Sequence, residues 1–550
     1  MRQGRLLKRL YRHGVQLMAV GVCTGIFAGI IVTFYNLAAE FLGKYSQDIY
    51  TGIRENPEFV PLLFVVLAIS AFAIGTLVYL IPAIRGSGIP QTEGATRGLV
   101  KFKWYQTLPA MAAASLYCIF CGLTAGAEGP SLMIGASCGD GTGRLFHCND
   151  MERRYQITGG ASAGLAVAFN APLTGIIFAF EEAHRRFTPA IFICAFTSVL
   201  SGIITRSVLY DLMGLEVTEV LTSFVLVQMP LKSYGFVAIA AVVCGLCGVG
   251  FYYLCMLMRK VFAKITFFKG IGKMLIPFLT AGVFGLITLY VMGGGASFIN
   301  ALGTEGGKVT TTLETIFNSP IAVTLVIVLI MRVISTSFNL GAGVPAGVFI
   351  PMLAIGACLG ALISRFCILI GMDTVFSDCI VMISMATFFA SVVKSPLTAI
   401  VMVVELTWQF SLLIPVILGV AVGYLISEIF GTKPLYEKLL ESILDEQHIH
   451  PIKYTYSTTI DNGAMVAGSA IRDVLWPGNM LIRSVHRDGN LIVPSSDTVL
   501  RVGDEITLQA ECVDFEDLKN CIDELVKPRK HLLSNNDRND HTNQPPPNID

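Results

Sequence analysis

Three short segments, each running from glycine to proline, interrupt the apolar front of the chain and carry the groups best suited to hold an ion. They are residues 86–90 (Gly-Ser-Gly-Ile-Pro), 126–130 (Gly-Ala-Glu-Gly-Pro) and 347–351 (Gly-Val-Phe-Ile-Pro). Proline favours the first turn of a helix, and a helix start offers unpaired N–H groups and the positive end of the helix dipole. If these starts converge, they would bind an anion without a buried Lys or Arg, which would hold the ion too tightly for release. Close helix packing would also explain the glycines, but it does not explain the recurring glycine-to-proline spacing.

Polar side chains in these segments and in the later apolar runs add possible chemistry. Ser87 offers a hydroxyl donor, and Glu128 places a carboxylate where an anion would bind. Because an ionisable residue at membrane depth is a functional candidate, we expect the ionised carboxylate to occupy the anion position and the protonated one to leave it. Glu181 and Glu182 end an apolar run beside basic residues, so an ordinary charged boundary also explains them. Glu405 has the same two interpretations.

The elements that must position these groups are membrane helices. The chain is 53% hydrophobic and only 14% charged, with a mean hydropathy of +0.66, whereas soluble domains carry about a quarter charged residues. Several apolar runs, such as 15–38 and 233–258, reach the roughly 20 residues that cross a bilayer. These features exclude a soluble enzyme, a nucleic-acid binder and a disordered scaffold. The basic, uncleaved N-terminal segment predicts a cytoplasmic N-terminus.

Two later segments resemble each other, 171–182 (APLTGIIFAFEE) and 395–406 (SPLTAIVMVVEL). Each follows a glycine-to-proline segment, and the two prolines lie 42 residues apart in the first case and 45 in the second. Matched halves with interrupted helices predict a transporter built from repeats, with its site at the repeat interface. The sequence does not decide whether the repeats are inverted.

The composition changes near residue 440. Residues 441–550 hold 18 acids and 10 bases, whereas the preceding part holds 21 acids and 29 bases. Short alternating runs after residue 460, turn signals such as Asp488-Gly489 and a polar helix over 514–526 predict a small α+β domain. Residues 528–550 are expected to be disordered. The 14 cysteines lie mostly in apolar runs, so we expect them to pack rather than bind metal, and we expect no cofactor.

At its three glycine-to-proline segments the sequence resembles the CLC family of chloride channels and chloride/proton exchangers. Residues 86–90 match that family's G-S-G-I-P motif, 126–130 its G-[K/R]-E-G-P motif and 347–351 its G-x-F-x-P motif. Residues 433–436 (Lys-Pro-Leu-Tyr) are similar to the segment that carries the family's pore tyrosine. The resemblance covers about 15–445. It implies an all-α polytopic membrane fold, an inverted repeat of broken and tilted helices, and a homodimer with one pore in each subunit.

The resemblance also implies roles for individual residues. Glu128 would be the external gating glutamate, and Glu182 would match the internal proton-transfer glutamate of exchangers. Hydroxyl and backbone N–H groups would hold a central chloride, and further N–H groups would hold an outer one. The residues implied for these chloride positions are Gly86, Ser87, Ala127, Gly129, Val348, Phe349, Ile350 and Tyr436.

Two of these residues bear on how anions are selected and bound. Ala127 stands where the family usually has Lys or Arg, so the positive potential near the outer chloride position is expected to be weaker. Serine at position 87 resembles chloride-selecting members, in contrast to the proline of nitrate-selecting members. The sequence therefore predicts a preference for chloride over nitrate.

The tail, from Gly468 to Asp504, resembles an RCK C-terminal (TrkA-C) domain in its turns and alternation. Such domains elsewhere dimerise and bind small ligands, including cyclic dinucleotides. The predicted organisation is a transmembrane domain over 1–445, a linker over 446–459 and a regulatory domain over 460–527.

We therefore predict a chloride/proton antiporter of the plasma membrane, with a cytoplasmic N-terminus and tail. Its expected partners are chloride, protons, lipid, a second copy of the chain, and a small-molecule or nucleotide ligand of the tail. The alternative is a passive voltage- or ligand-gated chloride channel of the same fold, since Glu128 fits both functions and Glu182 favours exchange. An intramembrane hydrolase would need a base beside a nucleophile such as Ser87. No His or Lys lies near Ser87 in the sequence, so no enzymatic activity is expected.

Overall fold

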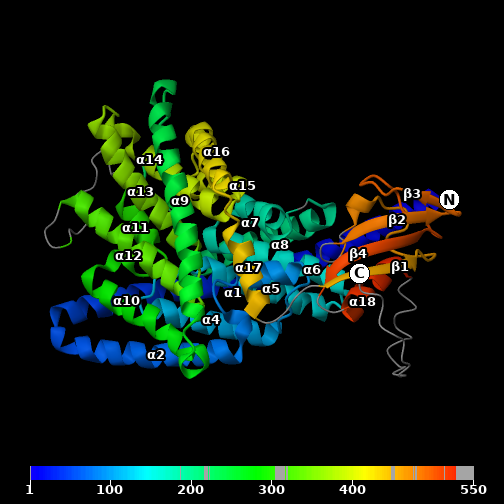
Figure 1. Cartoon of the computed structure of the whole chain (residues 1–550), viewed down its shortest axis with the longest axis horizontal. Helices are drawn as coiled ribbons and strands as arrows, with labels where there is room; N and C mark the ends of the chain where they lie inside the picture. The colour runs from blue at the N-terminus through cyan, green and yellow to red at the C-terminus, as the bar shows by residue number, and fades with distance from the viewer. Residues whose placement is uncertain are drawn as a thin grey trace.

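Figure 1 shows a computed structural model of the chain, in which a large body of helices carries a small sheet domain at one end. The structure describes residues 2–527 except 186, 216–220, 222, 304–315, 317–319, 447–451, 475, 477–479 and 513–514. The predicted disordered segment, 528–550, therefore lies outside the described residues, and so does the part of the predicted linker at 447–451.

The body is all α, as the sequence predicted. Nine helical segments of the described chain are long and apolar enough to cross a membrane, by length and composition. Shorter helices lie between them, because glycine and proline at the breaks stop one helix and favour the start of the next. The helices are α1 Arg2–Glu55, α2 Val60–Leu80, α3 Ile89–Thr96, α4 Trp104–Phe120, α5 Glu128–Leu145, α6 Asp150–Phe169, α7 Pro172–Phe178, α8 Pro189–Leu212, α9 Tyr234–Ala263, α10 Leu275–Ile287, α11 Ala296–Ala301, α12 Ile321–Ala342, α13 Phe349–Leu369, α14 Ser377–Val393, α15 Pro396–Thr407, α16 Leu413–Ile429 and α17 Leu435–Glu446.

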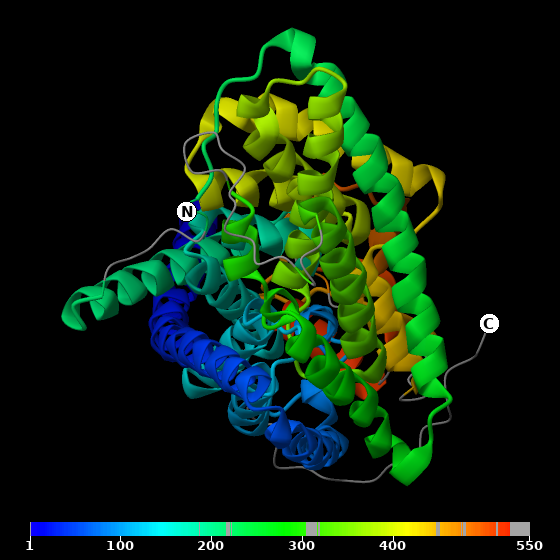
Figure 2. The same ribbon diagram turned by 90° about the vertical axis from the view of Figure 1, so that its left-hand side faces the viewer.

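Large apolar side chains cover much of the outside of this body. Phe34, Ile69, Leu257 and Ile414 are between 51% and 66% exposed. In Figure 2, the long helix α9 runs along one side of the body from top to bottom. Its 30 residues are enough to cross the hydrocarbon core of a bilayer. An exposed apolar surface of this extent requires lipid rather than water around it. The chain is a multi-pass membrane protein.

The two predicted repeats are present in the body, and they are inverted. Helix α5 packs on α6 ahead of α7, and α13 packs on α14 ahead of α15. The starts of α5 and α13 meet head to head, because Gly126 and Gly347 form an isolated antiparallel bridge. Their N–H groups donate to each other's carbonyl oxygens at 2.8 and 2.9 Å. This contact answers the question of orientation that the sequence left open.

The tail folds into the predicted small α+β domain. Its antiparallel sheet has the order β1 (Ile452–Thr459), β4 (Glu505–Cys512), β2 (Leu481–Arg487) and β3 (Asn490–Ile492), and α18 (Phe515–Val526) packs against β1. Asp488 and Gly489 form the turn between β2 and β3, with φ of +50° and +79°. Strand β1 lies within the predicted linker of 446–459. Its alternating burial includes Tyr454 and Tyr456, which the sequence analysis did not count as a strand signal, so the domain begins at Ile452.

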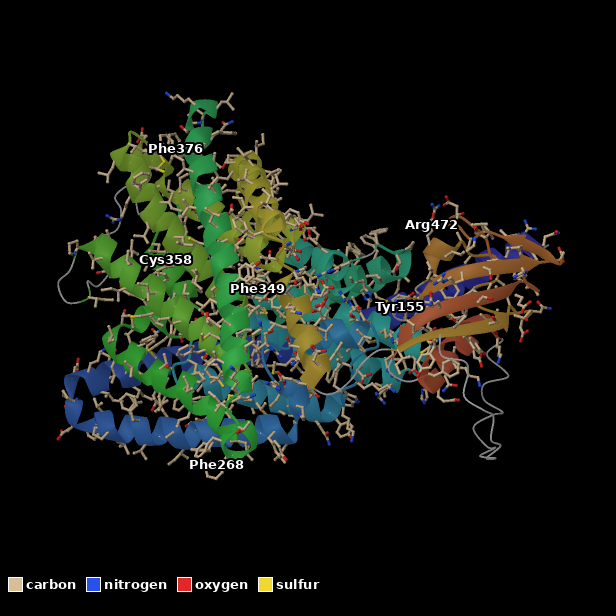
Figure 3. The ribbon with its side chains drawn as sticks, in the orientation of Figure 1. Tyr155, Phe268, Phe349, Cys358, Phe376 and Arg472 are labelled. Carbon is tan, nitrogen blue, oxygen red and sulfur yellow. The ribbon has the colours of Figure 1, made fainter. Side chains whose placement is uncertain are left out.

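The sheet domain packs directly onto the body near α6 and α8. One apolar cluster contains Met151, Tyr155 and Ile191 of the body together with Trp476 and Val485 of the domain. Figure 3 labels Tyr155 at this junction. Because α6 also packs along α5, α6 lies between the sheet domain and the helix that begins at Glu128.

Candidate functional site

The three glycine-to-proline segments meet in the middle of the body, as the sequence predicted. A Cβ atom on Gly347 would lie only 2.6 Å from the carbonyl oxygen of Gly126. A Cβ atom on Gly129 would lie 2.5 Å from the carbonyl oxygen of Ser87. These distances are too short for any side chain, so glycine is what lets the three backbone segments approach. The starts of α3, α5 and α13 thus face one small region.

Glu128, the first residue of α5, is buried at the point where α5 and α13 meet. Its carboxylate lies within hydrogen-bonding range of the backbone N–H groups of Ala127, Glu128 and Ile350. One carboxylate oxygen, Oε2, has no hydrogen-bond partner among the described residues. The carboxylate therefore fills the place between two helix starts where the sequence predicted an anion.

Ser87 and Tyr436 both bury a hydroxyl oxygen that has no partner within the described part of the chain. Tyr436 is the second residue of α17 and lies close enough to Glu128 and Glu182 to interact with both charges. Buried hydroxyl groups without partners are rare, and an unseen ion or water is a common explanation. A cavity beside Ser87 provides the space for one, and its lining includes Arg85, Gly86, Pro90, Arg259, Asn339, Val348 and Leu439.

The remaining predicted chloride-binding residues lie at the start of α13. Val348 precedes the helix, and Phe349 and Ile350 are its first two residues. The first N–H groups of a helix have no partner within it. All three side chains are buried, so these N–H groups can serve an ion without competition from bulk water.

Glu181 and Glu405, by contrast, have complete sets of partners and cap each other's repeat. The Glu405 carboxylate accepts hydrogen bonds from the N–H groups of Leu173 and Thr174 at 2.7 Å and from the Thr174 hydroxyl at 2.6 Å, at the start of α7. Glu181 accepts the same three bonds from the Pro-Leu-Thr start of α15, at 2.6 to 2.8 Å. These two glutamates therefore serve the fold.

Glu182 follows Glu181 directly but lies in a different environment. It is buried, and neither of its carboxylate oxygens has a hydrogen-bond partner among the described residues. Polar groups close enough to interact with it are Glu181, Ser395, Glu93 and Arg185. Glu182 belongs to a π-helix, Ala179–Ala183, that continues α7. Such wider turns occur often at functional sites, and no sequence signal indicated this one.

A family model described as voltage gated chloride channel matches residues 69–428, more than half of the chain. The chain belongs to this family. The match spans both repeats, from α2 to α16, and agrees with the CLC motifs of the sequence. A second family model, described as TrkA-C domain, matches residues 456–520, which lie in the sheet domain.

Named relatives cover nearly the whole body. The H(+)/Cl(-) exchange transporter ClcA of Vibrio cholerae is 28% identical over 444 residues, which are 79% of this chain and 91% of that protein. The H(+)/Cl(-) exchange transporter ClcA of Yersinia pseudotuberculosis is 28% identical over 453 residues, 81% and 92% of the two chains. The crystal structure of a slow cyanobacterial Cl-/H+ antiporter matches with a TM-score of 0.69 and 25% identity, over 78% of this chain and 99% of that one.

One polar residue beside the site was missed by the sequence analysis. Arg332 lies within α12 and is fully buried, and its Nε and Nη2 atoms have no partner in the described chain. The signal that could have found it is a single charge inside an apolar helix of 22 residues.

Proposed function

We propose that this chain exchanges chloride for protons across a cell membrane. The observation that carries the proposal is the combination of two buried carboxylates, Glu128 and Glu182, with open hydrogen-bonding capacity, and a tyrosine hydroxyl near both. The names of the relatives support it, since they are exchange transporters rather than channels. A passive channel needs a gate at Glu128 but has no use for a second unpartnered carboxylate at Glu182.

Chloride and the ionised Glu128 carboxylate would compete for the same N–H groups. Both are anions, so they cannot occupy one helix-start site together. Protonation removes the charge of Glu128 and weakens its attraction to the positive ends of α5 and α13. The side chain then leaves, chloride enters, and the proton travels with the carboxyl group until the carboxylate returns.

The central chloride would lie where Ser87 and Tyr436 bury their free hydroxyl groups. Both hydroxyls would donate to the ion, together with the N–H groups of Val348 and Phe349. Hydrogen bonds to a charged group are the stronger kind, yet none of these donors carries a full charge. The ion can therefore shed its hydration shell and still be released.

Glu182 would relay protons between the cytoplasm and Glu128. The structure offers it no cap of the sort that holds Glu181, so its carboxyl group is free to gain and lose a proton. Neither side chain can span the distance to the other on its own, so water or further polar groups must complete the path. No enzymatic step is required at any point.

Charge and packing support an orientation in the membrane, and the family resemblance supports a homodimer. The basic residues near the N-terminus favour a cytoplasmic start, and α1 enters the body beside the sheet domain (Figure 1), so both would face the cytoplasm of a plasma-membrane homodimer. The TrkA-C-like domain would bind a small-molecule or nucleotide ligand and transmit its state through α6. A ligand changes activity only if it binds two states unequally.

Purified protein in liposomes with an imposed chloride gradient tests the proposal. Chloride efflux and internal pH should be recorded together, and chloride leaving the liposomes should drive protons inward against their own gradient. Glu128→Gln should abolish proton movement while chloride still flows. The matched control is Glu428→Gln on α16, which changes a half-exposed glutamate paired with Lys394. Chloride flux in the wild-type protein without uphill proton movement would establish a channel instead.

A further inference from the structure

Arg332 is a buried cation without a counter-ion in the described part of the chain. Its side chain is 0% exposed. The Nη1 atom donates to the Gly294 carbonyl at 3.3 Å, and the guanidinium lies 5.0 Å from the centre of the Phe298 ring. Nε and Nη2 have no partner among the described residues. A buried charge is costly unless it is paired, so the surroundings of Arg332 call for an anion.

Only Gly294 lies between the Arg332 guanidinium and the helix starts that hold Glu128. A Cβ atom on Gly294 would lie 3.4 Å from the Cα of Gly126 and 3.5 Å from Cγ2 of Ile350. Gly126 and Ile350 belong to the two segments that meet at the Glu128 carboxylate. Gly294 itself is partly exposed, whereas Gly126 is buried. The Gly294 backbone therefore separates Arg332 from the anion position and also reaches the surface.

This position is on the side of the site away from the sheet domain's linker. Gly343, just after α12, lines the cavity beside Ser87 together with residues of α17, whose last residue, Glu446, leads into the linker. Arg332 lies eleven residues earlier on α12, which is about 16 Å along the helix axis. With the sheet domain in the cytoplasm, as proposed above, Arg332 would lie near the outer end of the anion path and the Ser87 cavity near the inner end.

The helix starts themselves carry no positive side chain. Residues 122–143 and 344–364, which contain the starts of α5 and α13, include no Lys or Arg. Ala127 in particular leaves the segment before Glu128 without a charge. Arg332 brings a full positive charge to the same place from α12, more than 200 residues after Glu128 in the sequence.

We propose that Arg332 is the fixed positive charge of an outer chloride position, and that chloride passing Gly294 is its missing counter-ion. The proposal rests on the chloride transport described above. Arg332 would act through space and through the Gly294 peptide rather than by direct binding. It would raise the local chloride concentration without holding the ion so tightly that it stays.

The test measures chloride flux in oriented liposomes as external chloride is varied. R332Q should weaken the apparent affinity for external chloride by about tenfold, which corresponds to about 1.4 kcal/mol. The ratio of protons to chloride should stay at its wild-type value, because Glu128 and Glu182 are intact. Adding A127R to R332Q should recover at least half of the lost affinity, since it returns a positive charge to the same region.

A second buried arginine provides the matched control. Arg206 on α8 is 8% exposed, lies 4.7 Å from the centre of the Tyr210 ring and has an unpartnered Nη1 atom. R206Q should leave the affinity for external chloride unchanged. An R332Q protein that melts and elutes like the wild type and keeps its chloride affinity would overturn the proposal.

Two further variants distinguish chloride from a protein counter-ion. Glu305 and Glu314 belong to residues 304–315, outside the described chain. If E305Q or E314Q reproduces the R332Q phenotype, a carboxylate is the partner and the proposal is wrong. If R332Q does not fold, A127R in the wild-type background adds a second positive charge to the same region and should strengthen the apparent affinity for external chloride; an unchanged affinity there would contradict the proposal. Calorimetry of chloride binding to the purified protein tests the role of Arg332 without transport. If chloride and proton fluxes prove to be uncoupled, only the proposed exchange fails, and the binding result still decides the role of Arg332.

Discussion

Helices α7 and α15 begin with the same Pro-Leu-Thr sequence and end differently. Nine residues after the proline, each supplies a glutamate, Glu181 or Glu405, that caps the start of the other helix. Helix α15 stays α-helical through Leu406 and ends at Thr407, whereas α7 widens into a π-helix that carries Glu182 at the corresponding place. The residues that the repeats share hold the fold together, and the residue that differs is the one we assign to proton transfer.

Hydrogen-bond completeness separates the two groups. Buried polar atoms are almost always paired, and the capping glutamates follow that rule with three donors each. Glu182 departs from it, and so do Ser87 and Tyr436. Unpaired polar groups cost stability, so we interpret the three near Glu128 as a functional requirement rather than a packing one.

Within this comparison of the two repeats, the largest effect should come from Glu182→Gln. Glutamine cannot carry a proton, so proton flux should fall by about 100-fold, a typical loss for a proton-transfer group. Chloride flux should continue, because the helix starts are unchanged. The measurement is the paired recording of chloride efflux and liposome pH.

The same variant also tests the structural half of the comparison. Because Glu182 makes no hydrogen bond in the described chain, Glu182→Gln should melt at or above the wild-type temperature. Full proton coupling in Glu182→Gln would mean that Glu182 does not transfer protons and is only a charged residue at the membrane boundary.

The next effect concerns stability and should come from Glu405→Gln. An amide can accept only part of what the carboxylate accepts, and its NH2 group would face the N–H groups of Leu173 and Thr174. Lost bonds to a charged group and unsatisfied donors together should cost roughly 2–4 kcal/mol. Thermal melting in detergent should show this loss, and Glu181→Gln should show a similar one.

The fraction of the Glu405→Gln protein that folds should keep proton coupling, because Glu405 lies outside the proposed proton path. Glu40→Gln, at an exposed position of α1 where the glutamate pairs with the exposed Lys44, is the control for melting. An unchanged melting temperature in Glu405→Gln would mean that the reciprocal caps do not matter to the fold.

The sequence predicted the local features and missed the relations between distant residues. Proline after glycine located the starts of α3, α5 and α13, because helix starts depend on local backbone preferences. The reciprocal caps join residues 216 to 232 positions apart, and a single sequence carries no record of such pairing. The π-helix at Glu182 also depends on tertiary contacts. Arg332 was missed because its significance lies in partners that it lacks.

A smaller effect is expected from changing Ser87, one of the buried residues whose polar atoms have no partner in the described chain. Its hydroxyl is buried and free to donate to a chloride ion. Ser87→Pro removes this donor and should lower the preference for chloride over nitrate by roughly fivefold, the value of about 1 kcal/mol. Flux of each anion in liposomes gives the ratio. Ser87→Ala, which keeps an ordinary backbone, should shift the ratio in the same direction, and an unchanged ratio in both variants would exclude Ser87 as an ion ligand.

The smallest effect should appear where the sheet domain meets the body, at a carboxylate that faces other acids. Burial, followed by the charges of Asp150 and Glu152, raises the pKa of Glu524 to about 7 from an ordinary value of 4.5, against the opposing N–H of Asp150 and the charge of Arg153. The docked state thus favours the neutral form. The stabilisation of the docked state by neutral Glu524 is therefore complete below pH 4.5 and is lost as the pH rises through 7.

Hydrogen exchange in the full-length protein, corrected for intrinsic rates, measures this docking. Protection of α18 should decrease between pH 5.5 and 8 in the wild-type protein. Glu524→Gln stays neutral at every pH, so its protection should be the same at both values and should exceed that of the wild type at pH 8. Glu516→Gln, at an exposed position of the same helix, should keep the wild-type pH dependence. If Glu524→Gln loses protection across this range just as the wild type does, the acids at the start of α6 do not oppose Glu524. The docking must then depend on the other contacts of this junction, such as the apolar cluster and the contact of Arg154 with Cys521, and a ligand would have to act through those.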